Sequence, residues 1–254
     1  MPLLSLGPDT ELYFDRIEGA DSRPVLVFLH EGLGCTAMWK DFPARLCAAT
    51  GCEGLVYDRL GYGLSSPLRR RRSIHYLHEF ALTELPAVLE ALLSGREYLL
   101  VGHSDGGSIA LIHAAARPQG LRAVVTGAAH VFVEDITLQG IRAAKAAYAE
   151  GKLRGLQRYH GDKTDAVFAA WADTWLDPAF AHWNIEYLLP AMDCPVLALQ
   201  GARDQYGSAA QLDAIAGQAA NARQAVLPDC GHSPHAEAAE ATLEAMLGFI
   251  LRNT

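Results

Sequence analysis

The chain has 254 residues, of which 50% are hydrophobic and 20% are charged, and its formal net charge is −8. This length suits one α/β domain with an insertion better than two domains. The negative charge argues against nucleic acid as a partner, and no apolar stretch is long enough to span a membrane. Five scattered cysteines without metal-ligand spacing favour reduced thiols, so we expect a cytoplasmic protein without a metal site.

The predicted elements alternate between strands and helices along the chain. Residues 11–16 are expected to form an antiparallel edge strand, and 24–30 a strand buried on both faces. The same buried apolar pattern recurs at 54–57, 98–103, 122–128, 195–200 and 224–227. Helical patterns fill the intervals, including 38–46, 77–92 and a C-terminal amphipathic helix at 236–251. This alternation predicts an α/β fold with a mostly parallel sheet that helices cover on both faces.

Residues 133–192 interrupt the alternation, because they are mostly helical in pattern and contain no good strand. Three of the four tryptophans fall in this segment, at Trp171, Trp175 and Trp183. We interpret the segment as a helical cap (lid) inserted into a core made of residues 1–132 and 193–254. Ligands of open α/β sheets bind beyond the carboxyl ends of the strands, so these tryptophans are candidate pocket residues. The alternative is that they pack only against the base of the cap.

The most informative motif is Gly102-His103-Ser104-Asp105-Gly106, which reads G-x-S-x-G. An apolar run of strand type precedes it, and a small-residue, helix-forming run follows it. A serine at such a strand-to-helix turn is lifted above the sheet and sits at a helix N-terminus, where amides favour developing negative charge. Ser104 is therefore the candidate nucleophile, and residues 102–106 are the candidate nucleophile elbow.

A serine hydroxyl needs a base to take its proton, and the base needs a partner that orients it. His232 follows a predicted strand and comes directly after a glycine, and Asp204 lies just past the end of another strand. His235 is a rival base only three residues away, and we favour His232 because of the preceding glycine. Two backbone amides must hold the oxyanion, and we expect them from Gly32 and Asp105. A tight glycine turn without a catalytic role is the alternative for Gly32.

Taken together, these motifs resemble the α/β-hydrolase superfamily, in the serine-hydrolase branch that carries a helical cap. The resemblance covers nearly the whole chain, including the loop at His30, the turn at 58–65, the elbow at Ser104, and Asp204 and His232 in the family's order. The Ser-Asp-Gly-Gly elbow resembles that of valacyclovirase-like esterases. The resemblance implies the α/β-hydrolase fold and a Ser-His-Asp triad, and it leaves the substrate open.

Two positions depart from the family pattern or add to it. Glu31 stands where the family usually has glycine or alanine, and an ionised carboxylate beside an oxyanion hole would oppose catalysis. Its side chain must point to the surface, pair with a cation or be protonated; we keep it as a candidate pocket residue. The Asp105 side chain either enters the pocket, where it would select a cationic group such as an amine, or caps the helix that starts there.

The sequence therefore predicts a serine hydrolase that cleaves a small ester, thioester or lactone through an acyl-enzyme on Ser104. The expected partner is a small-molecule substrate, without cofactor, metal, nucleic acid or membrane, and nothing in the pattern indicates an oligomeric state. Two alternatives stay open: a carbon–carbon bond hydrolase of ring-fission products, and a slow-turnover ligand receptor on the same fold.

Overall fold

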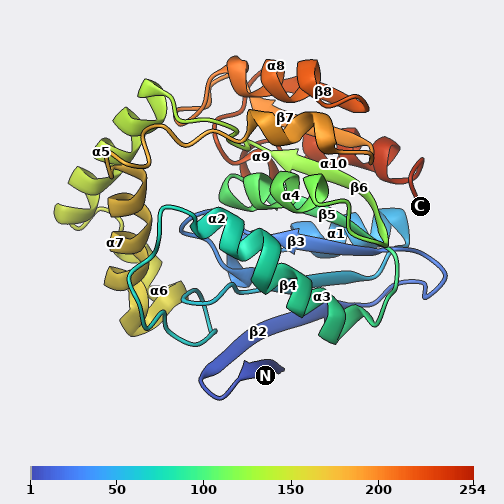
Figure 1. Ribbon diagram of the computed structural model, residues 1–254, viewed down its shortest axis with the longest axis horizontal. Coiled ribbons are helices and arrows are strands. Elements are labelled where there is room, and N and C mark those ends of the chain that lie inside the picture. Colours follow the sequence, from blue (N-terminus) through green and yellow to red (C-terminus); the bar gives the residue numbers. More distant parts are fainter. Residues whose placement is uncertain (1) are drawn as a thin grey trace.

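The computed structural model describes residues 2–254 and is organised around one sheet (Figure 1). In this range the sheet has eight strands in the order β1-β2-β4-β3-β5-β6-β7-β8. The strands are β1 (Leu3–Gly7), β2 (Thr10–Ile17), β3 (Val25–Leu29), β4 (Gly54–Tyr57), β5 (Tyr98–His103), β6 (Leu121–Gly127), β7 (Val196–Gly201) and β8 (Ala222–Leu227). All pairs from β4 to β8 are parallel, so the mostly parallel sheet is confirmed.

The first two strands correct one prediction. Residues 11–16 lie in β2, which is antiparallel to β4 as expected. They do not form the edge, however, because β1 pairs with the other side of β2 and places Leu4 opposite Leu12. The turn between Gly7 and Thr10 reverses the chain, and the resulting hairpin leaves Leu12 fully buried.

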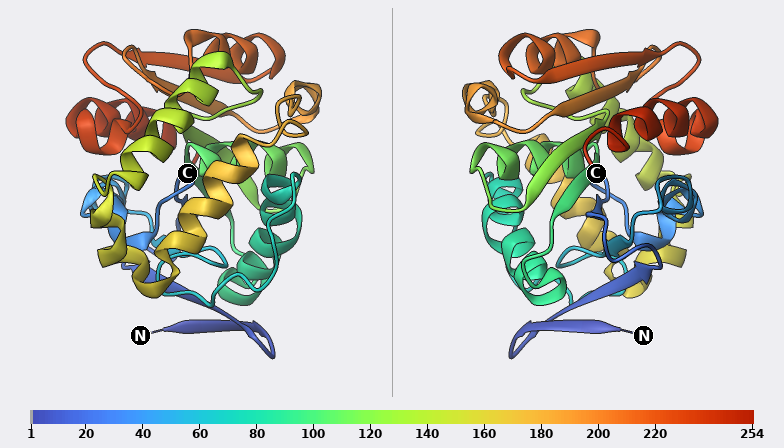
Figure 2. Two further views of the ribbon diagram at one scale, coloured as in Figure 1. Left: turned by 90° about the vertical axis from the view of Figure 1, so that its left-hand side faces the viewer. Right: turned by 90° about the vertical axis from the view of Figure 1, so that its right-hand side faces the viewer.

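Helices cover both faces of the sheet, as predicted. The main ones are α1 (Phe42–Thr50), α3 (Leu85–Leu93), α4 (Asp105–Ala115), α8 (Ala209–Gln218) and α10 (Ala239–Ile250). Strand β3 shows why both faces are apolar, because its side chains alternate between them. Leu26 and Phe28 belong to the core formed with α1 and α10, whereas Val27 belongs to the opposite core, which includes residues of α3 and α4. Figure 2 shows these layers from the two ends.

Three helical predictions differ in detail from the structure. The C-terminal pattern forms two helices, α9 (Pro234–Glu237) and α10, because Ala238 leaves the helical region with φ −137° and ψ 49°. The pattern at 38–46 is split into a 3₁₀ turn, η1 (Thr36–Trp39), and α1, because Lys40 between them has φ 54°. The pattern at 77–92 is continuous but contains a π-turn, η2 (Phe80–Glu84), between α2 (Tyr76–Glu79) and α3.

The segment between β6 and β7 contains α5 (Asp135–Ala149), η3 (Arg154–Leu156), α6 (Gln157–His160), η4 (Gly161–Lys163), α7 (Thr164–Trp175) and η5 (Glu186–Ala191). Figures 1 and 2 show α5, α6 and α7 gathered at one end of the sheet. The two ends of the segment are joined, because Val133 donates to the Trp183 carbonyl and Ile185 donates to the Val131 carbonyl. Within residues 2–254, no helix is both long and apolar enough to cross a membrane.

Candidate functional site

Ser104 lies at a strained turn between β5 and α4. Its backbone has φ 53° and ψ −118°, a region that side-chain-bearing residues rarely adopt. The flanking glycines are required by space, since a Cβ on Gly102 would lie 2.3 Å from the Gly106 carbonyl oxygen, and one on Gly106 would lie 2.0 Å from that of Leu29. The Ser104 amide donates to the Gly127 carbonyl at 2.8 Å, which ties the turn to β6.

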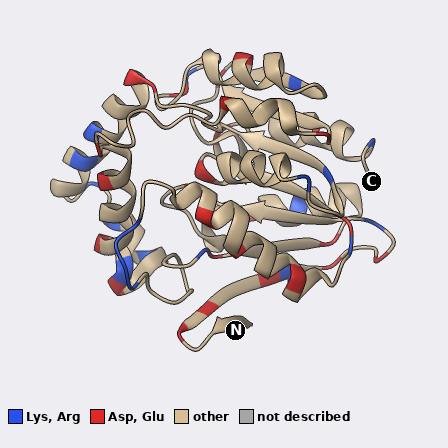
Figure 3. Ribbon diagram, viewed as in Figure 1, with Lys and Arg blue, Asp and Glu red and all other residues tan. Residues whose placement is uncertain are grey.

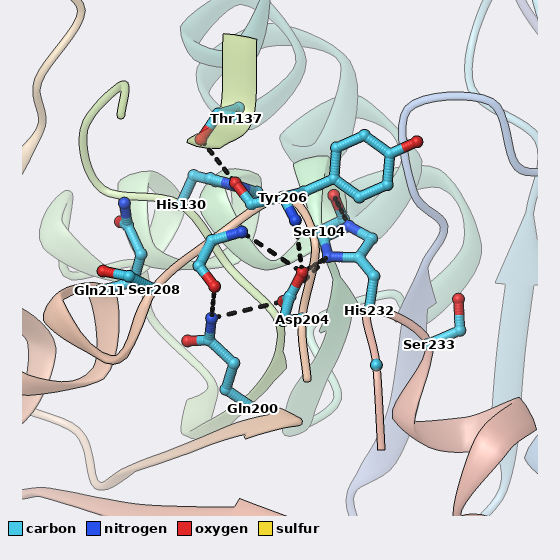
Figure 4. A network of polar contacts seen from close by, with 12 residues as sticks. Ser104, His130, Thr137, Gln200, Asp204, Tyr206, Ser208, Gln211, His232 and Ser233 are labelled. Carbon is cyan, nitrogen blue, oxygen red and sulfur yellow. Dashed lines mark hydrogen bonds and ion pairs between the residues drawn. The ribbon is translucent and has the colours of Figure 1, made fainter. Parts of the chain in front are cut away.

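Three of the predicted side chains meet at this turn (Figure 4). The His232 Nδ1 lies 2.8 Å and 3.0 Å from the two carboxylate oxygens of Asp204, and its Nε2 lies 2.9 Å from the Ser104 Oγ. A carboxylate can only accept, so Nδ1 carries the proton, Nε2 is free to accept, and the Ser104 hydroxyl donates to it. The side chains of Asp204 and His232 are only 1% and 13% exposed, so water competes little with these hydrogen bonds.

The loop after β7 holds the Asp204 carboxylate in place. Oδ1 accepts the Tyr206 amide at 2.8 Å and the Gly207 amide at 3.3 Å, and Oδ2 accepts from the Gln200 side chain at 3.3 Å. Burial alone would raise the pKa of Asp204, but the hydrogen bond and charge of His232 outweigh burial and lower it. Asp204 is therefore ionised at neutral pH and can stabilise a protonated His232.

His235, the rival base, occupies a different environment. Its ring packs against Trp39 with centroids 4.6 Å apart and against His103 at 4.9 Å. Burial and the charge of Lys40 lower the pKa of His235 to about 4. The structure brings His232, not His235, to Ser104, and the glycine before His232 was the sequence signal that distinguished them.

The two expected oxyanion amides lie on the elbow and on the loop after β3, and the two come close together, since a Cβ on Gly32 would lie 3.1 Å from the Asp105 Oδ2. Among residues 2–254, neither the Gly32 nor the Asp105 amide has a hydrogen-bond acceptor, so both are available to a ligand. Gly32 cannot carry a side chain, since a Cβ there would lie 2.5 Å from the Trp171 ring. The Arg59 guanidinium holds this loop by donating hydrogen bonds to the carbonyls of His30 and Glu31.

Glu31 lines the cavity beside Ser104, so the surface-directed alternative is wrong. Its Oε2 accepts the Leu33 amide at 2.5 Å, which turns the carboxyl back onto its own loop. Burial raises the pKa of Glu31, the Leu33 amide opposes that shift, and the nearby Asp105 carboxylate adds to it. A raised pKa reduces the negative charge that Glu31 places near the oxyanion amides at neutral pH.

The Asp105 side chain also faces the cavity and is 1% exposed. Its Oδ2 accepts from the Tyr76 hydroxyl at 2.7 Å, and Tyr76 in turn accepts from the Trp175 indole at 2.9 Å. Its hydrogen bond is thus to Tyr76 and not to the first amides of α4, which favours the pocket role over the capping role. Arg72, from the basic loop before α2 (Figure 3), lies over the Tyr76 ring at 4.6 Å.

The three tryptophans of the inserted segment occupy different positions. Trp171 and Trp175 line a cavity of about 170 Å³ together with Ser104 and Asp105. Trp183 does not line it, which corrects that prediction. Its ring stacks on Phe180, with centroids 5.5 Å apart and an interplanar angle of 13°, and it meets the edge of Trp175 from behind.

His130 and Tyr206 also line this cavity, and the sequence interpretation missed both. Both rings face His232, with centroids 5.8 Å and 4.8 Å away. His130 follows the end of β6, and Tyr206 follows Asp204 by two residues, so position after a strand was the available signal. In the described part of the chain, no three His, Cys, Asp or Glu side chains are grouped as metal ligands.

Comparisons with known proteins agree with this architecture. The human serine hydrolase BPHL is 28% identical over 190 residues, which cover 71% of this chain and 63% of that protein. The 2-succinyl-6-hydroxy-2,4-cyclohexadiene-1-carboxylate synthase of Enterobacter sp. (strain 638) is 28% identical over 163 residues, covering 64% of this chain and 56% of that protein. The chain thus spans less than two thirds of the length of these relatives.

A solved structure and a family model complete the comparison. MGS-M2, an alpha/beta hydrolase enzyme from a Medee basin deep-sea metagenome library, has a TM-score of 0.78 at 18% identity, covering 100% of this chain and 98% of that one. The model of the alpha/beta hydrolase family matches residues 26–245, which include the elbow and the loops that carry Asp204 and His232. The chain therefore belongs to the alpha/beta hydrolase family.

Proposed function

We propose that the protein is a serine hydrolase that cleaves a small ester, thioester or lactone through an acyl-enzyme on Ser104. The observation that carries the proposal is the hydrogen-bond chain from Asp204 through His232 to Ser104, at the wall of a cavity. The Gly32 and Asp105 amides, which have no acceptor within residues 2–254, would meet the remaining requirement of acyl transfer, which is stabilisation of an oxyanion.

The reaction follows from these positions. The Ser104 Oγ attacks the acyl carbon while its proton passes to His232 Nε2, and the Asp204 carboxylate stabilises the imidazolium. The carbonyl oxygen becomes an oxyanion between the Gly32 and Asp105 amides. His232 then gives its proton to the leaving oxygen or sulfur, and the acyl group stays on Ser104. A water attacks the acyl-enzyme with His232 as base, which releases the acid and restores the serine.

The residues that line the cavity suggest different roles for two parts of the chain. We infer that residues 1–132 and 193–254 form the catalytic core and that residues 133–192 form a cap over it. Trp171 and Trp175 of the cap would then bound the acyl group. The Asp105 carboxylate is buried at the cavity wall, where water screens its charge only weakly. It would therefore favour an acyl group that carries an amine.

The test is hydrolysis of short-chain 4-nitrophenyl esters by wild type and by Ser104→Ala. We expect loss on the order of 10⁶ in kcat in the variant, because the nucleophile of a serine triad cannot be replaced by its neighbours. Ser22→Ala is the matched control, since that exposed serine precedes β3 and does not line the cavity. A fluorophosphonate probe should label wild type and Ser22→Ala and leave Ser104→Ala unlabelled.

Three outcomes would contradict the proposal. More than a tenth of wild-type activity in Ser104→Ala would remove the nucleophile assignment. Labelling of Ser104 without steady-state ester turnover would instead favour a slow-turnover receptor, and turnover of ring-fission diketones but not esters would favour carbon–carbon bond hydrolysis.

A further inference from the structure

A second chamber adjoins the cavity at Ser104. We call the cavity that contains Ser104, Asp105 and His232 the nucleophile chamber. The side chamber, of about 210 Å³, has walls from the loop after β3 and from the loop after His232. The two chambers share Glu31, His103 and Ser233 as lining residues, so they meet at these three side chains.

The position of the side chamber suits the leaving group, if the proposed function holds. His232 must hand its proton to the leaving atom, so the leaving group has to extend along the His232 loop. Ser233 and His235 of that loop line the side chamber. Trp39, Met38 and Tyr159 give it an apolar and aromatic lining, which fits a flat or hydrophobic group.

The charge in the side chamber comes from few groups. Burial lowers the pKa of His30, His103 and His235, the last to about 4, so these rings are neutral at pH 7. Burial raises the pKa of the Cys35 thiol to about 12. The groups that remain are Lys40 and Glu31.

Lys40 is an unpaired cation among the described residues. Its ammonium makes no ion pair or hydrogen bond within residues 2–254, although it lies close enough to His235 to lower the pKa of that ring. Its backbone has φ 54° and ψ −129°, nearly the conformation of Ser104. Such a conformation is unfavourable in a residue other than glycine, so glycine would be the more stable choice at this position.

Glu31 does not neutralise this lysine, since the two side chains form no ion pair. The Glu31 carboxyl accepts a hydrogen bond from the Leu33 amide at the junction of the two chambers. A leaving group that suits both residues has a neutral body beside Glu31 and an anionic end at Lys40. We propose that the side chamber is a leaving-group subsite that selects alcohols or thiols bearing a terminal carboxylate or similar anion, which Lys40 binds.

The experiment compares two esters that differ only in charge, 4-butyryloxybenzoate and 4-butyryloxybenzamide. The measured quantity is the ratio of kcat/KM for the anionic ester to kcat/KM for the neutral ester. The intrinsic reactivities of the two esters cancel when this ratio is compared between variants. We expect Lys40→Gln to lower the ratio about threefold to tenfold, mainly through KM, as for a partly exposed ion pair. In wild type the ratio should also fall in about 0.5 M sodium chloride, because salt screens exposed charges.

Two further variants separate charge from folding. Lys40→Gly should lower the ratio as much as Lys40→Gln while the melting temperature stays the same or rises, because glycine relieves the positive φ. Lys152→Gln removes an exposed lysine of the inserted segment that does not line either chamber, and its ratio should equal that of wild type.

An unchanged ratio in both Lys40 variants, with the neutral ester still hydrolysed, would overturn the subsite and leave the proposed function standing. Absence of Ser104-dependent hydrolysis of either ester in wild type would overturn the proposed function and the subsite with it.

Discussion

The loops at the carboxyl ends of the strands and the inserted segment contribute different kinds of side chain to the same cavity. The loops after β5 and β7 bring Ser104 and Asp204, each held by hydrogen bonds from the backbone. The inserted segment contributes Trp171 and Trp175, which are held mainly by ring packing. The first region fixes the positions of hydrogen-bond donors and acceptors, whereas the second fixes the shape of the cavity.

This difference indicates which substitutions should affect the reaction and which should affect the choice of substrate. Hydrogen-bonded groups of one catalytic unit fail together when any member is removed. Apolar walls change affinity in proportion to the contacts that they make with a ligand. Substitutions in the first region should therefore lower kcat, and substitutions in the second should change KM or the preferred substrate.

The largest effect is expected at His232. His232→Ala should lower kcat for a 4-nitrophenyl ester by more than about 10⁴, because the Ser104 hydroxyl loses its base. His235→Ala should keep kcat within about tenfold of wild type, since that ring packs on Trp39 and does not reach Ser104. Steady-state kinetics of the two purified variants measure the contrast. An inactive His235→Ala variant together with an active His232→Ala variant would show that His232 is not the general base.

A smaller effect is expected from the walls. Trp171→Ala should change KM or the preferred acyl length by about tenfold to a hundredfold, since it removes a large aromatic surface from the cavity. Trp183→Ala is the matched control, because that ring lies behind Trp175 and outside the cavity. It should lower the free energy of unfolding by about 3–5 kcal/mol without altering the kinetics of the folded fraction. Equal kinetic effects in both variants would show that Trp171 does not contact the substrate any more than Trp183 does.

The smallest effect is expected at Asp105, which belongs to the proposed catalytic core and whose carboxylate lines the cavity together with the tryptophans. Wild type should hydrolyse the 4-nitrophenyl ester of valine faster than 4-nitrophenyl isovalerate, which lacks only the amino group. Asp105→Asn should narrow that gap by about tenfold, or about 1.4 kcal/mol, because the attraction to the ammonium is lost. Hydrolysis of the isovalerate ester should persist, since the oxyanion contact is a backbone amide. No preference for the valine ester in wild type would leave Asp105 with a structural role only.

The predictable parts of the molecule were those encoded by local sequence. The elbow at Ser104 is specified by two glycines, a preceding strand and a following helix, all within a few residues. The alternation of strands and helices is specified by hydrophobic period, and it gave the parallel sheet correctly. His232 could be separated from His235 because a glycine precedes it.

The parts that sequence reasoning missed depend on contacts between distant residues. The Tyr76 hydroxyl is hydrogen-bonded to both Asp105 and Trp175, and Trp175 lies 99 residues from Tyr76 in the sequence. No local sequence pattern indicates such a contact. Trp183 could not be separated from Trp171 because both are aromatic residues in one helical segment, and only the fold decides which ring faces inward. Strand β1 was missed because five residues with a short apolar alternation become a strand only when β2 offers an edge.

The proposed mechanism requires that Ser104 carries the acyl group during each turnover. The most direct test is to mix wild type rapidly with a 4-nitrophenyl ester and to measure the mass of the intact protein. Proteolytic digestion of the same sample then locates the adduct. We expect a mass increase equal to the acyl group on the peptide that contains Ser104. This adduct should decay at the rate of turnover and should be absent in Ser104→Ala. An adduct on another residue, or turnover in which Ser104 remains unmodified and dispensable, would contradict it.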